Sequence, residues 1–257
     1  MRKPLKLAVH LFLLTLSLAS HAVAETVLRV VTYDFPPLIS RNEENRESYL
    51  IEILRAVGDE MGVTFAIDYM PWKRGEQTVM RGEAWGTLPY IRTPEREKHF
   101  LFSDELYHNK IRLFHYRARK EIRGIDFNEV RDLAGHSIGG VMGYFYVSEF
   151  LGAGGRLELV TNDHQNIQKL ILGRVSLALI NETVGWYIIE KDFPGAGLEN
   201  FGTLEKPYSI IRPGLMTSKA YPGGGQILSR FNAALKKVKA SGTYRAITDK
   251  YGVRVYF

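Results

Sequence analysis

The loop at residues 92–99 holds the side chain best suited to bind an anion. It follows a short apolar run at residues 86–91, which is typical of a buried strand. In open α/β sheets, ligands bind where such strands end, and arginine holds a carboxylate through two parallel hydrogen bonds. We therefore expect Arg96 to clamp an anionic group of a small ligand. The alternative is a surface ion pair with Glu95 or Glu97.

Aromatic side chains follow two other predicted strands. Residues 33–38 come after a valine-rich strand, and their two prolines are incompatible with a helix or with regular strand pairing. Residues 143–146 form a glycine turn that carries three aromatic rings into a helix. We expect both segments to present rings at strand ends.

No combination of residues predicts a catalytic or metal site. The sequence has no Ser/His/Asp constellation and no phosphate-binding loop. His99, His108, His115 and His136 are scattered over different predicted elements, which does not suit a zinc site. We expect no catalytic residues, no metal and no cofactor.

Residues 1–24 have the composition of a secretory signal peptide. Basic residues at positions 2–6 precede a mostly apolar run at 7–20, and small residues at 22–24 suit a signal peptidase. A membrane anchor, the alternative, needs about 20 consecutive apolar residues, and this run is shorter. We expect cleavage after Ala24 and a soluble periplasmic protein.

The remaining composition excludes other classes of protein. The formal charge of +6 includes three basic residues of the predicted signal peptide, and the other basic residues are scattered. This balance does not suggest a nucleic-acid partner. The chain has no cysteine, so neither a disulfide nor a lipid-modified cysteine is expected.

Alternating strand and helix patterns predict sheets covered by helices. The polar stretch at 117–126 interrupts the alternation, which then resumes. Ser48 and Thr243 are expected to cap helices, and Gly62 to end one. Strands are expected at residues 27–32, 63–69, 86–91, 110–116, 137–141, 156–160 and 175–180, and helices at 48–61, 71–81, 147–151, 163–172, 182–191 and in the last segment up to 251.

Several segments form one pattern through their order and spacing. They are Val30–Leu38, Leu50–Gly62, Thr93–Glu97 with Phe102-Ser103, Leu133–Tyr144, Leu170–Ile180 and Phe231–Tyr244. With them, the whole chain after the signal peptide resembles the periplasmic solute-binding proteins of family 3, the polar amino-acid type.

The resemblance implies a two-lobe α/β fold of the periplasmic-binding-protein type (type II) with two hinge crossings. Lobe one would comprise residues 25–110 and 213–257, and lobe two residues 111–212. A monomer is expected. The ligand would lie in the cleft and would be buried when the lobes close.

The resemblance also implies a set of ligand-binding residues. The family's carboxylate-binding arginine lies in a Thr-x-x-Arg loop, which corresponds to Thr93 and Arg96, and backbone groups near Ile91 would assist. Pro89 has no N–H, so one donor common in relatives is missing. The aromatic lid corresponds to Phe35 beside Tyr33.

In lobe two, the glycine turn corresponds to Gly143, Tyr144, Phe145 and Tyr146, whose backbone N–H groups would form an anion site. Relatives that bind α-amino acids place an aspartate after the buried strand to pair with the ammonium. Here that position holds Asn181, with Glu182 beside it.

This departure leaves two interpretations. Either Glu182 replaces the missing charge, or the ligand is not a standard α-amino acid; Asn181 itself also suits a helix cap. The rings at 144–146, and Trp72 near the cleft with Lys73 and Arg74, suit a flat or aromatic acid or one with two acidic groups. Trp72 could instead belong to the core.

The expected function is capture of a small carboxylate, an amino acid or a related acid, for an ABC permease or a membrane sensor. One alternative is a periplasmic dehydratase of the same fold, for which Glu182 and His108 are the candidate acid–base residues. Another is a signalling relative whose cleft no longer binds.

Overall fold

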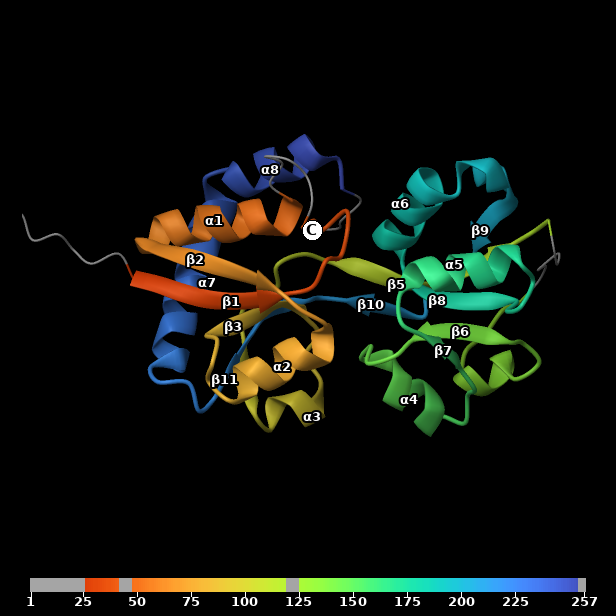
Figure 1. Ribbon diagram of the computed structural model, residues 1–257, viewed down its shortest axis with the longest axis horizontal. Helices are drawn as coiled ribbons and strands as arrows, with labels where there is room; N and C mark the ends of the chain where they lie inside the picture. Colours follow the sequence, from red (N-terminus) through yellow and green to blue (C-terminus); the bar gives the residue numbers. More distant parts are fainter. Residues whose placement is uncertain (1–25, 42–47, 119–124, 254–257) are drawn as a thin grey trace, which may run out of the picture.

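The computed structural model describes residues 26–41, 48–118 and 125–253 of the chain. The predicted signal peptide lies outside these residues. The chain forms two lobes side by side, each built on a sheet with helices on its faces (Figure 1). The fold is therefore the predicted mixed α/β architecture of two lobes.

The first sheet has the strand order β2-β1-β3-β11-β4. Parallel pairing joins β1 to β2 and β3, whereas β11 runs antiparallel to β3 and β4. Helices α1, α7 and α8 lie on one side of this sheet, and α2 and α3 on the other (Figure 1). The elements are β1 (Thr26–Thr32), α1 (Tyr49–Met61), β2 (Val63–Tyr69), α2 (Trp72–Met80), β3 (Gly86–Tyr90), α3 (Pro94–Glu97), β4 (Phe100–Phe102), β11 (Gly214–Ser218), α7 (Gly224–Ala240) and α8 (Thr243–Tyr251).

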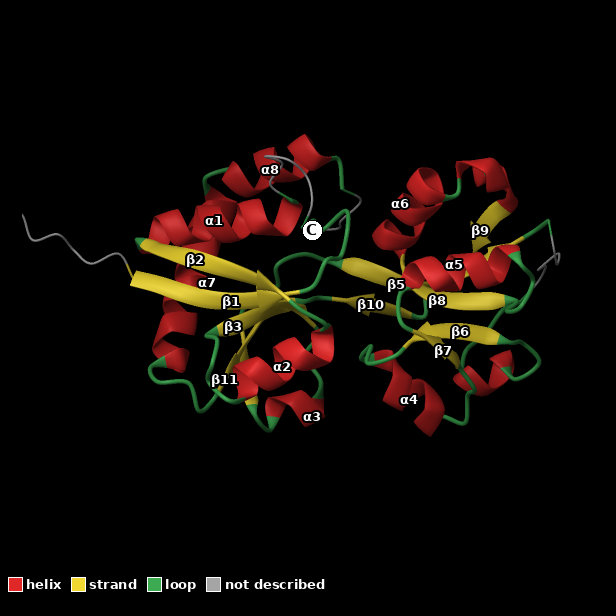
Figure 2. Cartoon of the chain, viewed as in Figure 1, coloured by secondary structure: helices red, strands yellow, loops and turns green. Residues whose placement is uncertain are grey.

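The second sheet has the order β10-β5-β8-β6-β7, and β9 also pairs with β5. Parallel pairing joins β6 to β7 and β8, and β5 runs antiparallel to β8. Helices α5 and α6 pack on one side and α4 lies on the other (Figure 2). The elements are β5 (Asn109–Tyr116), a 3-10 turn (Val130–Leu133), β6 (Ile138–Val141), α4 (Tyr146–Gly152), β7 (Glu158–Val160), α5 (Asp163–Ile171), β8 (Leu177–Asn181), α6 (Glu182–Asp192), β9 (Phe201–Thr203) and β10 (Ser209–Ile211).

The chain passes between the sheets twice. It leaves the first sheet after β4 and enters the second at β5, and it returns from β10 to β11. Strands β5 and β10 pair antiparallel, Ser209 opposite Ile111, so the two passages lie side by side. The exact lobe boundaries, 25–110 with 213–257 and 111–212, stay a prediction.

Local sequence explains most element boundaries. The apolar stripe of α1 is buried, and Gly62 ends this helix with a φ of 66°, a conformation that glycine adopts without strain. Ser48 lies at the N-cap, but its hydroxyl makes no capping hydrogen bond. The predicted cap at Thr243 is wrong by one residue: Gly242 is the N-cap and Thr243 begins α8.

Helices α1 and α8, far apart in the sequence, meet in the first lobe. The hydroxyls of Tyr49 on α1 and Tyr244 on α8 lie 2.8 Å apart, and Tyr244 also donates to the carbonyl of Leu106. Tyr107 packs its ring against Tyr49. This cluster supports the start of the first passage between the sheets. None of the helices in the described part is long and apolar enough to span a membrane.

Candidate functional site

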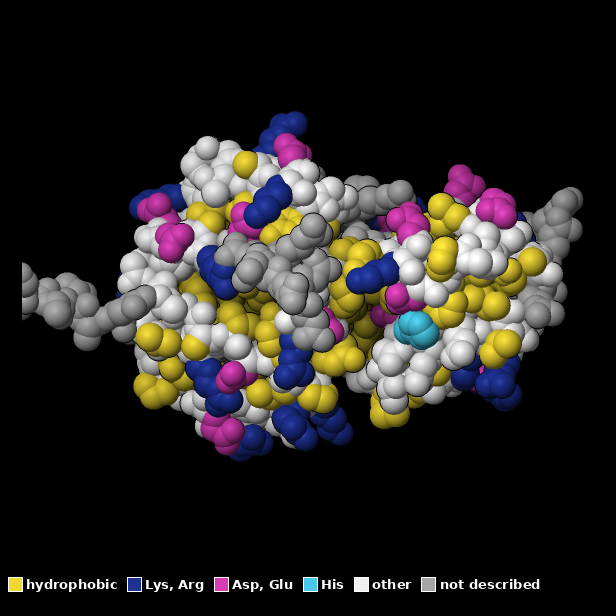
Figure 3. Space-filling model, turned by 45° about the horizontal axis from the view of Figure 1, so that its top comes forward, with side chains coloured by type: hydrophobic (Ala, Val, Ile, Leu, Met, Phe, Trp, Pro, Cys, Tyr) yellow, Lys and Arg dark blue, Asp and Glu magenta, His cyan; other side chains and the backbone are white. Residues whose placement is uncertain are grey.

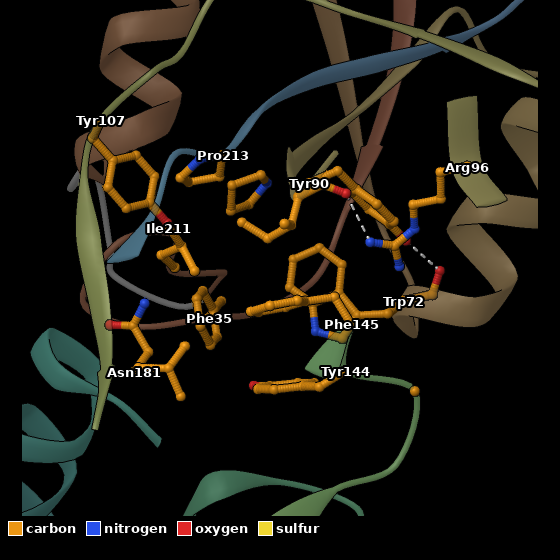
Figure 4. A pocket seen from close by; sticks show the side chains of 14 residues that line it. Phe35, Trp72, Tyr90, Arg96, Tyr107, Tyr144, Phe145, Asn181, Ile211 and Pro213 are labelled. Carbon is orange, nitrogen blue, oxygen red and sulfur yellow. Dashed lines mark hydrogen bonds between the residues drawn. The ribbon is translucent and has the colours of Figure 1, made fainter. Parts of the chain in front are cut away.

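A pocket that is partly open to solvent lies between the two lobes. Apolar side chains are visible at this junction in the space-filling view (Figure 3). The close-up shows rings from both lobes around one space, with Arg96 and Asn181 on opposite sides of it (Figure 4). The lining residues are Phe35, Trp72, Pro89, Tyr90, Ile91, Arg96, Tyr107, Ile111, Gly143, Tyr144, Phe145, Asn181, Ile211 and Pro213.

Strand ends build most of this pocket. Strands β1 and β3 of the first sheet and β6 and β8 of the second all end at it, which is where open α/β sheets bind ligands. Residues of the two passages between the sheets complete the wall: Tyr107 and Ile111 on one, Ile211 and Pro213 on the other. Both lobes and the hinge therefore contribute to a single site.

Arg96 is held in this pocket by several contacts. Thr93 caps α3 by accepting a hydrogen bond from the backbone N of Arg96 at 3.3 Å. The guanidinium donates from Nη1 to the carbonyl of Ile91 at 3.0 Å and lies 4.7 Å from the centre of the Tyr90 ring. Only 16% of the Arg96 side chain is exposed. The short helix and the end of β3 thus aim the guanidinium.

The ion-pair partner of Arg96 is Glu76 on α2. Glu76 Oε2 lies 3.2 Å from Nε and 3.1 Å from Nη2. Glu95 and Glu97, the partners considered from the sequence, pair instead with Lys98 and Arg92. The surface ion pair proposed as an alternative is therefore wrong in its partners, and Arg96 carries a partly balanced charge into the pocket.

Trp72 is the centre of the aromatic wall in the first lobe. Its ring centroid lies 5.4 Å from that of Tyr33, 5.8 Å from that of Phe35 and 5.5 Å from that of Tyr90. The Tyr90 hydroxyl donates to the Trp72 carbonyl at 2.7 Å, and burial raises the pKa of Tyr90 well above its ordinary value. Trp72 therefore both lines the pocket and packs in the lobe.

The glycine turn of the second lobe places two rings in the pocket and a third in the core. Gly143 has a φ of 83°, which permits the turn, and Tyr144 and Phe145 line the pocket. Tyr146 is fully buried, accepts a hydrogen bond from Val141 N at 3.1 Å and donates to Leu179 O at 3.0 Å.

The predicted nest of N–H groups loses one donor in this structure. The backbone N of Tyr144 donates to Val141 O at 3.2 Å. Binding of an anion by the other backbone N–H groups of this turn stays a prediction.

Behind the pocket, Tyr144 donates to a buried carboxyl. Its hydroxyl lies 2.8 Å from Oδ2 of Asp163, the first residue of α5. Burial raises the pKa of Asp163 to about 7. Burial and the nearby Asp163 also raise the pKa of Tyr144, so its hydroxyl keeps its proton.

Asn181 both lines the pocket and caps α6. Its Oδ1 accepts from the backbone N of Val184 at 3.3 Å, and its side chain is buried. Glu182 is not a lining residue; its Oε1 lies 2.6 Å from Nε of Arg112, and both side chains are 14% exposed.

Most residues predicted from the sequence meet at the pocket. Those that line it are Ile91, Arg96, Phe35, Trp72, Gly143, Tyr144, Phe145 and Asn181; those that do not are Thr93, Tyr33, Tyr146 and Glu182. Thr93 and Tyr33 contact lining residues, whereas Tyr146 and Glu182 have structural partners.

Sequence reasoning missed the lining residues of the hinge. Tyr107, Ile111, Ile211 and Pro213 carry no chemical pattern of their own. The only signal is their place next to the predicted passages between lobes. Within the described residues, no group of three or more His, Cys, Asp or Glu could hold a metal ion.

The sequence profile of the bacterial extracellular solute-binding proteins, family 3, matches residues 28–254. A comparison with curated protein sequences finds no significant match.

Solved structures share the fold at low sequence identity. A histidine kinase sensor domain with similarity to periplasmic binding proteins has a TM-score of 0.76 at 20% identity, over 90% of this chain and 99% of that one. An ancestral arginine-binding protein bound to arginine has a TM-score of 0.73 at 22% sequence identity, over 88% of this chain and 98% of that one. An amino acid ABC transporter substrate-binding protein from Streptococcus pneumoniae, bound to L-arginine, has a TM-score of 0.71 at 19% sequence identity, over 88% of this chain and 94% of that one.

Proposed function

The chain belongs to the bacterial extracellular solute-binding proteins of family 3, and from this membership we propose that it captures a small carboxylate, an amino acid or a related acid, between its two lobes. Capture proceeds by lobe closure around the pocket. The loaded protein then delivers the acid to an ABC permease or presents it to a membrane sensor.

The observation that carries this proposal is the position of Arg96. Among the described residues that line the pocket, it is the only one with a charged side chain. Its guanidinium is largely buried, so an anion bound there is weakly screened by solvent. A planar guanidinium also matches a carboxylate in shape.

The comparisons favour neither partner over the other. The similar structures include a substrate-binding protein of an ABC transporter and the sensor domain of a histidine kinase. We propose secretion by the signal peptide at residues 1–24, a periplasmic location and a monomeric state.

The geometry does not favour the enzymatic alternative. Neither acid–base candidate lines the pocket: Glu182 is paired with Arg112, and His108 Nε2 lies 2.8 Å from Glu105 Oε1. The pocket has the arrangement of a binding site, with an anion clamp and rings that exclude water.

Thermal unfolding against a panel of carboxylates tests the function. The panel contains α-amino acids, dicarboxylates, aromatic acids and 2-oxo acids. A ligand at 100 times its Kd adds about 2.7 kcal/mol, which raises the Tm of a chain this size by about 5–10 °C. We expect at least one acid to give such a shift, and Arg96→Gln to abolish it.

Arg92→Gln is the matched control, since Arg92 is an exposed arginine of the same loop and does not line the pocket. It is expected to keep the full shift. No shift with any acid would support a relative that has lost binding. If an acid still raises the Tm of the Arg96→Gln variant, Arg96 is not the group that binds the anion.

A further inference from the structure

We propose that the ligand is an aromatic monocarboxylate whose second polar group is a hydrogen-bond acceptor, and that it carries no ammonium group. This proposal rests on the proposed function and defines the chemical class that the same pocket selects. The deciding residue is Asn181, which lies across the pocket from Arg96 (Figure 4).

The hydrogen bonding of Asn181 determines which of its atoms faces a ligand. Its Oδ1 accepts from the backbone N–H of Val184, and only an oxygen can accept that hydrogen bond, so the orientation of the amide is settled. The remaining polar group is Nδ2, for which the described residues offer no hydrogen-bond partner. Nδ2 can only donate, so it requires an acceptor on the ligand.

Three acidic side chains close to lining residues already have partners, and Asp34, next to Phe35, is exposed and accepts from the backbone N of Arg41. Glu76 pairs with Arg96, and Glu182 pairs with Arg112. Asp163 accepts from Tyr144, whose ring lies in the pocket wall while Asp163 does not. Among the described residues that line the pocket, none is acidic.

An ammonium group in this pocket would therefore lack a charged partner among the described residues that line it. Moving a cation out of water into a closed cleft is costly unless an anion or several acceptors replace the water. The rings attract a cation through their faces, but this attraction recovers only part of that cost. A neutral acceptor facing Asn181 incurs no such cost.

The rest of the wall selects a flat apolar body. The side chains between Arg96 and Asn181 are the rings of Phe35, Trp72, Tyr144 and Phe145 (Figure 4). Lys73 and Arg74 are exposed and do not line the pocket, so the described lining offers no second cation for a second acidic group. The combination fits one carboxylate, one aromatic body and one neutral acceptor.

Three probes that share one carbon skeleton test this class. L-phenylalanine carries an ammonium at the second carbon, phenylpyruvate carries a carbonyl there, and 3-phenylpropionate carries neither. Titration calorimetry measures the Kd of each on the full secreted chain. We expect phenylpyruvate to bind at least tenfold more tightly than L-phenylalanine, and more tightly than 3-phenylpropionate, which offers no acceptor to Asn181.

Asn181→Asp supplies the missing charge and tests the mechanism. Aspartate caps a helix as well as asparagine does, so α6 keeps its start. The ratio of the Kd for L-phenylalanine to the Kd for phenylpyruvate is expected to fall at least tenfold in this variant. The control is Asn162→Asp, which makes the same exchange at the N-cap of α5, a residue that does not line the pocket, and is expected to leave the ratio unchanged.

The outcomes separate this inference from the proposed function. Three outcomes overturn the inference: L-phenylalanine binds as tightly as phenylpyruvate, 3-phenylpropionate binds as tightly as phenylpyruvate, or the ratio of the Kd values for L-phenylalanine and phenylpyruvate is unchanged in an Asn181→Asp variant whose fold is intact by circular dichroism. Failure of all three probes, together with Arg96-dependent binding of some other acid, overturns the aromatic class and leaves the proposed function standing. Failure of every carboxylate overturns both.

Discussion

At the scale of single residues, the ion pair between Arg96 and Glu76 is the main feature of the site. Glu76 Oε2 occupies the side of the guanidinium that carries Nε and Nη2. The carbonyl oxygen of Ile91 accepts a hydrogen bond from Nη1. A ligand carboxylate therefore either shares the guanidinium with Glu76 or displaces it.

Replacing Glu76 by glutamine should strengthen acid binding. The amide removes the competing negative charge, and a charged hydrogen bond is about twice as strong as a neutral one. We expect the Kd for the best acid of the panel to fall about 3- to 10-fold, measured by titration calorimetry.

The opposite result is equally informative. Weaker acid binding by Glu76→Gln would mean that Glu76 acts by orienting Arg96 and not by competing with the ligand. The exposed pair of Arg92 and Glu97 offers the control, since Glu97→Gln should leave the Kd unchanged.

Asp163 makes stability depend on pH. Its pKa of about 7 in the folded protein compares with an ordinary value of 3.8, so the unfolded chain loses this proton first as pH rises. Folding stability therefore falls between about pH 4 and 7 and is lowest, for this group, above pH 7. Below pH 4 the carboxyl is protonated in both states and contributes no difference.

Asp163→Asn should remove this dependence, because the amide oxygen can still accept from Tyr144 and carries no charge. Relative to the unmodified protein, the variant should gain about 2–3 kcal/mol in the free energy of unfolding between pH 5 and pH 8. Urea unfolding at both pH values measures the gain. If the variant and the unmodified protein differ in free energy of unfolding by the same amount at both pH values, the raised pKa of Asp163 is contradicted.

At the scale of elements, the second lobe is held together near the pocket by Tyr146. This first residue of α4 bonds through its hydroxyl to Val141, at the end of β6, and to Leu179 in β8. The glycine turn at 143–145 lies between these anchored points. The position of Tyr144 and Phe145 in the pocket therefore depends on a buried hydroxyl.

Tyr146→Phe should destabilise the protein by about 1–3 kcal/mol, because a buried N–H and a buried carbonyl lose their partner. Chemical unfolding gives the value. Tyr208→Phe is the control: Tyr208 packs against the Tyr146 ring, and the structure gives its hydroxyl no partner among the described residues. It should stay within about 0.5 kcal/mol. Equal losses in both variants would refute the role of the Tyr146 hydroxyl.

At the scale of the whole molecule, the pocket exists only where the lobes meet. Phe35, Trp72 and Arg96 belong to the first lobe, and Tyr144 and Asn181 to the second. Ile91 packs against the apolar cluster of the second lobe. The structure therefore represents an arrangement in which the lobes are in contact across the site.

Ligand binding should make the molecule more compact. Without ligand, fewer contacts oppose the separation of two lobes joined by two passages, and a bound acid links both walls. Small-angle X-ray scattering should show a smaller radius of gyration at saturating ligand, and no change for Arg96→Gln at the same concentration. A radius unaffected by a ligand that binds would contradict closure.

The sequence by itself determined the local elements and the family. The strand–helix alternation predicted both sheets, and Gly62 and the stripe of α1 predicted a helix end and a buried face, because these depend on neighbouring residues. Arg96 and the glycine turn at 143–145 were predicted through their spacing within the family pattern. Arg96 and this turn line one pocket, and their role in binding stays a prediction.

The tertiary structure alone decided the partners. Glu76 lies 20 residues before Arg96, and Arg112 lies 70 residues before Glu182, so sequence spacing does not indicate either pair. Tyr107 and Ile211 line the pocket because the two chain segments that connect the lobes lie side by side. Whether a ring such as Tyr146 faces the pocket or the core depends on the rotation of its helix against the sheet, and packing of distant elements sets that rotation.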